Sequence, residues 1–137
     1  MSYFLRKLSL CFAAGAVGGV VNSLALWAAG AYGLTAALGV RLAPHLTPAW
    51  LYPRVVWGGL WGLLLMLPLA RASWLGRGLL ISLGPSLVQL LYLFPERLQA
   101  GMLGLKLGTP TPLVVLIGNA VWGLAAVLWL RGADRSL

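Results

Sequence analysis

One stretch decides the fold: WLYPRVVWGGLWG, residues 50–62, which opens an apolar run ending near residue 69. Aromatic rings such as those of Trp50 and Tyr52 favour the boundary between water and lipid, where each ring meets both phases. Pro53 is tolerated in a first helical turn because its missing N–H would be unpaired there anyway. The stretch therefore predicts a helix that passes from water into a membrane, with Arg54 close to its entrance.

The composition of the whole chain supports a membrane environment. Of its 137 residues, 61% are hydrophobic and 9% are charged, and the mean hydropathy is +0.92. A soluble domain of this length carries roughly a quarter charged residues. Such a surface would not stay in water, so lipid is the expected solvent. The length allows one helical bundle, and we predict a single domain over residues 1–137.

Four apolar runs are long enough to cross a bilayer, which takes about 20 residues. The predicted spans are residues 8–31, 50–70, 78–94 and 111–130. The first run is too long for a signal peptide, whose core is roughly 7–15 residues. We predict an all-α polytopic membrane protein with four transmembrane helices. Short interfacial or re-entrant segments are expected between spans 1 and 2 and between spans 3 and 4, and a surface loop resting on lipid is the alternative for the first of these.

The cations set the predicted orientation. Six lie on the side of the N-terminus, namely Arg6, Lys7, Arg71, Arg77, Arg131 and Arg135. Four lie on the other side, namely Arg41, Arg54, Arg97 and Lys106. The richer side is usually cytoplasmic. We therefore expect a multi-pass protein of the cell (inner) membrane with both termini in the cytoplasm. The net charge of +8 is spread between apolar runs, which favours membrane lipids over nucleic acid as partners.

The two halves of the chain resemble each other at a shift of 65 positions. Residues 38–42 (LGVRL) match residues 103–107 (LGLKL), and residues 56–58 match residues 121–123, both VWG, in the same register. The alternative is chance, because Leu and Gly are abundant and the first and third spans align poorly. We predict two related two-helix units whose pseudo-axis lies along the membrane normal.

Four polar side chains fall inside the predicted spans at similar depth: Asn22, Arg54, Gln89 and Asn119. Asn22 and Gln89 lie beyond the middle of helices that run outward. Arg54 and Asn119 come early in helices that run inward, and they correspond to each other at the shift of 65. All four are therefore expected in the outer half of the bundle.

This outer region is expected to be electropositive. The second and fourth helices point their N-termini outward, where the macrodipole attracts anions. Arg41 and Lys106 add positive charge on the same face. The functional interpretation is a site for an anion or an anionic headgroup. The alternative is that the three amides bond to one another and hold the helices together, while Arg54 binds ordinary lipid phosphate.

Three tryptophans, Trp57, Trp61 and Trp122, lie too deep for an interfacial belt and stand beside glycines. Rings in this position usually fill the space that a glycine leaves, and a lining for an apolar substrate is the alternative. The pairs Gly15 with Gly19 and Gly58 with Gly62 have the spacing of close helix contacts.

Several function classes lack their residues. No Asp or Glu falls within a predicted span, so the usual carboxylate for proton or cation coupling is missing. Cys11 and His45 are the only cysteine and histidine, and we predict no metal or cofactor. An enzyme needs a nucleophile, a base or a metal in mutual reach, and the sequence argues against one without excluding it.

Three functions remain from the sequence. The first is a transport protein, a channel or facilitator for a small anion or an anionic amphipathic solute, working as a homo-oligomer. Its predicted binding residues are Asn22, Arg54, Gln89, Asn119, Arg41, Lys106, Trp57 and Trp122. The second is a non-catalytic accessory subunit of a larger membrane complex. The third is a membrane enzyme acting on lipid headgroups near His45 and Arg54.

Overall fold

A computed structural model describes residues 2–69, 73–97 and 101–133. Within these ranges the chain is helical without a strand, so the predicted all-helical fold is confirmed there. The α-helices are α1 (Tyr3–Ala31), α2 (Leu34–Ala37), α3 (Pro48–Gly62), α4 (Trp74–Val88) and α5 (Thr111–Ala133). Two 3₁₀ segments, η1 (Leu63–Met66) and η3 (Met102–Leu107), and one π-helix, η2 (Gln89–Arg97), complete the fold.

Three helical stretches are long and apolar enough to cross a membrane: Tyr3–Ala31, Trp74–Glu96 and Thr111–Ala133. Their length and composition agree with the predicted membrane protein. The prediction of four spans is not confirmed, because α3 has only 15 residues. The helical run that starts with α3 ends at Met66, where Leu67 turns to extended backbone before Pro68.

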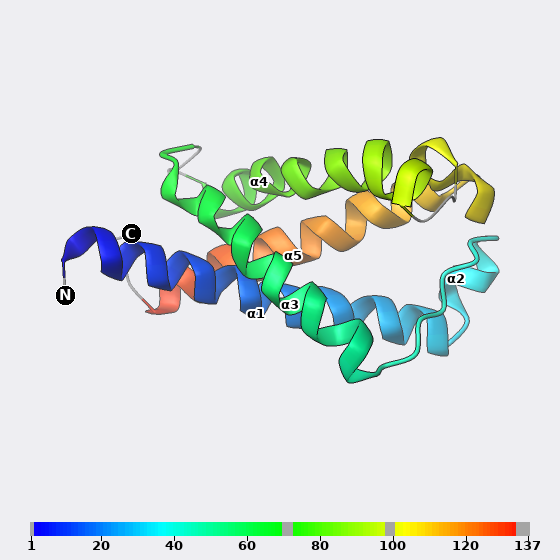
Figure 1. The fold of residues 1–137 in the computed structure, drawn as a ribbon, viewed down its shortest axis with the longest axis horizontal. Coiled ribbons are helices and arrows are strands. Elements are labelled where there is room, and N and C mark those ends of the chain that lie inside the picture. Colours follow the sequence, from blue (N-terminus) through cyan, green and yellow to red (C-terminus); the bar gives the residue numbers. More distant parts are fainter. Residues whose placement is uncertain (1, 70–72, 98–100, 134–137) are drawn as a thin grey trace.

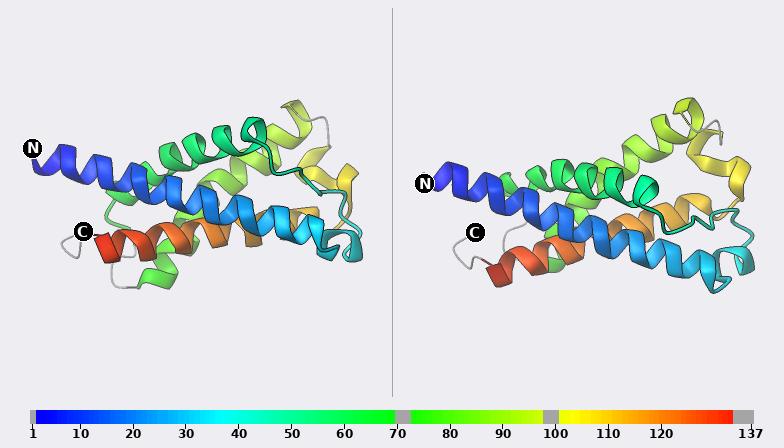
Figure 2. Two further views of the ribbon diagram at one scale, coloured as in Figure 1. Left: turned by 90° about the horizontal axis from the view of Figure 1, so that it is seen from below. Right: turned by 60° about the horizontal axis from the view of Figure 1, so that its bottom comes forward.

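The helices form an elongated bundle with two distinct ends (Figure 1). At the terminal end, α1 begins and α5 finishes. At the opposite end, which we call the loop end, α2 and η3 connect the long helices. Helix α1 packs against both α3 and α5, and α4 packs against α5. Figure 2 shows the segments after α1 and before α5 meeting at the loop end.

Glycines bring α1 and α3 into backbone contact. A Cβ added to Gly15 would collide with the carbonyl oxygen of Gly58 and lie 2.7 Å from the Cα of Gly62. The predicted close-packing faces are therefore confirmed. Helices α4 and α5 meet in the same way, since a Cβ on Gly78 would lie 3.1 Å from the carbonyl oxygen of Gly123. Backbones approach this closely only where no side chain intervenes.

Two cations satisfy backbone groups near the terminal end. Lys7 Nζ donates to the carbonyl of Met66 at 3.3 Å, and Arg77 Nη2 donates to that of Leu65 at 2.5 Å. These are the last carbonyls of η1, which have no intrahelical partner. Arg77 is only 6% exposed. Of the other predicted inner cations, Arg71 and Arg135 lie outside the described residues, as does the side chain of the outer Arg97.

The two connecting segments are tied to each other at the loop end. The amide of Arg41 donates to the carbonyl of Leu107 at 2.8 Å, and its guanidinium Nη2 donates to the carbonyl of Lys106. Thr35 Oγ1 holds the first segment by donating to the carbonyl of Leu42 at 2.7 Å. Residues 40–47, between α2 and α3, form no helix, so the predicted interfacial helix does not continue beyond Ala37.

The third long helix changes its winding at Gln89. Ser73 caps the start of α4 by accepting from the amide of Gly76 at 3.1 Å, so the helix begins before the predicted residue 78. Pro85 lies inside α4, and η2 continues as a π-helix to Arg97. Its wider turn bonds residue i to i+5, which brings residues five apart onto one side. π-Segments of this kind occur frequently at functional sites.

Candidate functional site

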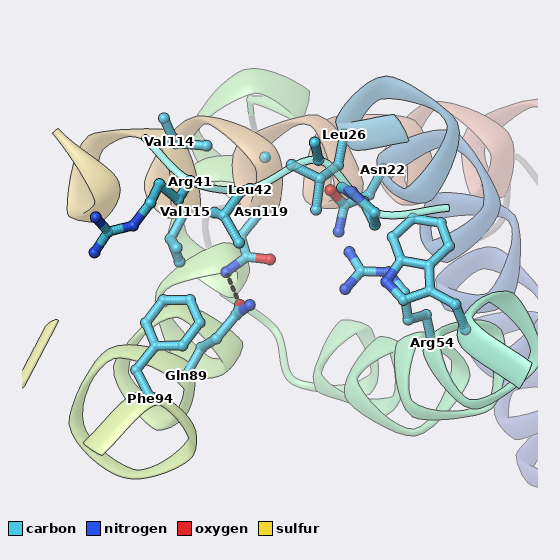
Figure 3. A pocket seen from close by; sticks show the side chains of 14 residues that line it. Asn22, Leu26, Arg41, Leu42, Arg54, Gln89, Phe94, Val114, Val115 and Asn119 are labelled. Atoms are coloured by element: carbon cyan, nitrogen blue, oxygen red, sulfur yellow. Dashed lines mark hydrogen bonds between the residues drawn. The ribbon is translucent and has the colours of Figure 1, made fainter. Parts of the chain in front are cut away.

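A cavity of about 310 Å³ lies near the loop end of the bundle. Its walls come from α1, the segment after α2, α3, η2 and α5 (Figure 3). The lining residues are Asn22, Leu26, Arg41, Leu42, Ala43, Pro44, Trp50, Arg54, Gln89, Phe94, Val114, Val115, Gly118 and Asn119. The cavity thus combines an apolar lining with a small number of polar groups, as ligand sites commonly do.

Arg54 is held in place by two contacts. Its Nε donates to Ser23 Oγ at 2.9 Å, and its guanidinium carbon lies 4.7 Å from the centre of the Trp50 ring. The terminal nitrogens of Arg54 donate no hydrogen bond within the described chain, and Figure 3 shows them pointing into the cavity. The guanidinium is therefore held by its Nε bond to Ser23 and by stacking on Trp50, and its terminal N–H groups are available to a ligand in the cavity.

Across the cavity, Asn119 and Gln89 are joined to each other. Asn119 Nδ2 donates to Ser86 Oγ at 3.0 Å and to Gln89 Oε1 at 3.2 Å. Asn119 is 7% exposed, and it links α5 to the helix that carries Ser86 and Gln89. This bond is the amide contact between helices that the sequence allowed as an alternative to ligand binding.

Asn22 stands apart from that pair. It lies on the side of the cavity where Arg54 is found (Figure 3). Its amide makes no hydrogen bond to the described residues. The carbonyl Oδ1 of Asn22 would lie 3.2 Å from a Cβ added to Gly118, so the glycine leaves space for this amide. Asn22 and Arg54 are thus outside the interhelical bond between Asn119 and Gln89.

The charge around the cavity is positive. Arg41 and Arg54 line it, and no acidic side chain is found among its described lining residues. Glu96 is exposed in η2 and does not line the cavity. The Arg54 guanidinium beside neutral amides favours an anion, since it offers N–H donors as well as charge, and Arg41 adds positive charge at the edge of the cavity.

The structure brings five of the eight predicted site residues to one place: Asn22, Arg41, Arg54, Gln89 and Asn119. It does not bring the other three there. Trp57 is 60% exposed on α3. Trp122 is 3% exposed, and its Nε1 donates to the carbonyl of Gly15 at 3.0 Å. Lys106 is exposed and meets Arg41 through its backbone carbonyl.

Sequence reasoning missed three residues that shape the site. Ser23 anchors Arg54, and Ser86 fixes Asn119. The signal for Ser86 was present, since it shares one helical side with Gln89. Phe94 lines the cavity with Gln89 because both belong to the π-helix, which an α-helical spacing does not predict.

The comparisons with known proteins add no function. The chain matches no protein-family model, no curated protein and no solved structure. No group of three or more metal-ligating side chains occurs among the residues that the structure describes. The residues that line the cavity are therefore the main evidence for a function.

Proposed function

We propose that this chain is a small integral membrane transport protein, a channel or facilitator for a small anion or an anionic amphipathic solute. The observation that carries the proposal is the position of Arg54. Its side chain is fixed by Ser23 and Trp50, while its terminal nitrogens face a cavity of about 310 Å³. Placing an arginine within an apolar span costs free energy because its charge loses contact with water. Charged residues in such positions commonly mark ion or substrate paths.

We propose four spans, with α3 and η1 together as the one that length alone does not establish. They contain 15 and 4 residues in one continuous helical run. At the rise of these helices the run is about 30 Å long, close to the thickness of a hydrocarbon core. In this arrangement the terminal end is cytoplasmic in the inner membrane, and the cavity is an outer vestibule.

We also propose that the two halves are related units. Trp50 and Val115, and likewise Arg54 and Asn119, are pairs separated by 65 positions, and all four residues line the cavity. A two-fold arrangement of duplicated units brings such pairs together around its axis. A homo-oligomer fits the small size of the bundle, because four helices leave little room for a continuous pore.

The test is anion movement in liposomes that contain the purified protein. Efflux of a small anion should be driven by its gradient and should fall at least about tenfold in Arg54→Ala, because a charge-assisted contact is worth about 1.5–3 kcal/mol. Arg131→Ala is the matched control, since Arg131 is exposed near the end of α5, away from the cavity.

Two results separate this proposal from its alternative. Equal efflux from liposomes with and without the wild-type protein contradicts transport. If a defined set of membrane proteins then co-purifies with the wild-type chain, the accessory-subunit hypothesis takes its place. The exposed apolar side chains of α3, Val56, Trp57 and Leu60, supply a surface for such a complex or for a second copy of the chain.

A further inference from the structure

A chain of hydrogen bonds from Ser86 through Asn119 to Gln89 lies beside the cavity. The backbone carbonyl of Ser82 determines which groups in it donate and which accept. Ser86 Oγ donates to the carbonyl of Ser82 at 2.7 Å. A hydroxyl has one proton to donate, so toward Asn119 the Ser86 oxygen acts only as an acceptor. Asn119 must therefore present Nδ2 to Ser86, and its second N–H goes to Gln89 Oε1. These hydrogen bonds determine which end of the Asn119 side chain is the nitrogen and which is the oxygen.

This direction determines what the two amides offer to the cavity. Both N–H groups of Asn119 are committed, so its remaining group is the acceptor Oδ1. Figure 3 shows this oxygen pointing toward the side where Arg54 lies. Gln89 uses Oε1 as an acceptor and keeps Nε2 as a donor. The walls thus present a cation on one side and a fixed hydrogen-bond acceptor on the other.

An anion with no proton to donate can accept from Arg54 and from Gln89 Nε2, but it places lone pairs against Asn119 Oδ1, which is repulsive. An anion that also carries an O–H satisfies both walls at once, because its proton bonds to that oxygen. Sites that require a hydrogen bond discriminate strongly against analogues that lack it.

We infer that the cavity selects an oxyanion that retains a proton donor, such as hydrogen phosphate or a singly protonated phosphate monoester, over an aprotic anion of equal charge. This inference rests on the proposed function and specifies its substrate class. The same group occurs in free phosphate and in the monoester headgroup of a lipid. The apolar part of the lining, with Leu26, Phe94 and Val115, leaves room for either source.

The test compares hydrogen phosphate with sulfate by calorimetric titration of the intact protein in detergent at mildly alkaline pH. Both probes are then dianions of similar size, and only phosphate has a proton to donate. Wild-type protein should bind phosphate about tenfold more tightly, the effect of about one hydrogen bond to a charged group. Equal binding, or tighter binding of sulfate, overturns the inference and leaves anion transport standing.

A lipid arm distinguishes the two sources of the phosphate group. At mildly acidic pH, where the monoester phosphate keeps one proton, vesicles containing phosphatidic acid are compared with vesicles containing phosphatidylmethanol. Both headgroups are then monoanions, and the diester has no proton to donate. Preference for phosphatidic acid without binding of free phosphate assigns the site to a lipid headgroup. No preference in either arm overturns the inference. No binding of any of the four probes overturns both the inference and the proposed function.

Two variants tie the selectivity to the hydrogen-bond chain. Asn119→Leu removes the acceptor, and Ser86→Ala frees one N–H of Asn119 so that the amide can turn toward the ligand. Each should bring the ratio of phosphate to sulfate affinity close to one. Ser9→Ala is the control, because Ser9 Oγ makes the same bond to the carbonyl four residues earlier, at 2.8 Å on Leu5, on an exposed surface of α1. If Ser86→Ala folds and keeps the wild-type ratio, the chain does not set the selectivity.

Discussion

Arg41 donates from its guanidinium Nη2 to the backbone carbonyl of Lys106, the residue 65 positions further along the chain. This is the same shift at which the two halves of the sequence are predicted to match. The amide of Arg41 also bonds to the carbonyl of Leu107 at 2.8 Å. These two bonds therefore tie the connecting segments to each other, beside a cavity that Arg41 lines.

The first prediction concerns this tie. Arg41→Ala removes the side-chain bond and keeps the backbone bond to Leu107, so the segment after α2 should loosen without unfolding the bundle. Amide hydrogen exchange of residues 39–43 should accelerate about tenfold, as expected for the loss of one exposed charge-assisted bond, while the Tm in detergent stays nearly constant. Arg131→Ala is the control, and unchanged exchange in Arg41→Ala would show that the backbone bond alone holds the segment.

The second prediction concerns the glycine contact between α1 and α3. Gly15→Ala places a methyl group against the backbone of Gly58 and Gly62, which cannot move without separating the helices. The free energy of unfolding should fall by about 1–3 kcal/mol or more. Thermal unfolding in detergent measures the change. Gly132→Ala is the matched control, because nothing lies within 4 Å of a Cβ at Gly132. Similar Tm values for the two variants would contradict the predicted packing.

The glycine packing and the shared depth of the polar side chains were accessible from the sequence. Asn22, Arg54, Gln89 and Asn119 sit at related depths in helices of alternating direction, so their meeting in one cavity follows once the helices pack. The predicted duplication is not confirmed. Gly58 and Gly123 differ by 65 positions, but their partners Gly15 and Gly78 differ by two fewer, so the registers of the two units are offset.

Other features depend on winding and on side-chain direction, which spacing does not specify. Phe94 joins Gln89 in the cavity because η2 is a π-helix, whereas residues five apart on an α-helix point about 140° away from each other. Lys106 was expected to contribute charge, but its backbone carbonyl makes the contact with Arg41. The predicted second span continued to residue 70, but the helical run ends at Met66, because Leu67 is extended before Pro68.

The third prediction separates packing from ligand binding for the deep tryptophans. Trp122→Phe keeps the six-membered ring but loses the pyrrole part of the indole and its bond to the carbonyl of Gly15. The lost bond and the space left in the core should together cost at least about 1 kcal/mol of stability. Trp57→Phe should cost almost nothing, because Trp57 is 60% exposed. Neither ring lines the cavity, so anion affinity should stay at the wild-type value in both variants. A loss of anion affinity in Trp122→Phe at unchanged Tm would contradict this prediction and support the sequence-based assignment of Trp122 to the binding site.

The fourth prediction concerns Ser23, which the sequence did not single out. Ser23 is fully buried, and its hydroxyl accepts from Arg54 Nε at 2.9 Å. Ser23→Ala leaves the charge of Arg54 in place but removes the bond that orients its outer nitrogens. Phosphate affinity should fall about tenfold, as for one charge-assisted hydrogen bond, while the bundle keeps its Tm within a few degrees.

Ser82→Ala is the matched control for Ser23→Ala. Ser82 is also a buried serine, at 4% exposure, but its hydroxyl donates to the carbonyl of Leu79 at 2.7 Å and makes no contact with Arg54. Calorimetric titration of both variants with phosphate compares an anchor of the guanidinium with a serine of similar burial. Equal affinity in the two variants would mean that the Trp50 ring, and not Ser23, positions Arg54, because stacking on that ring is the other contact that holds it.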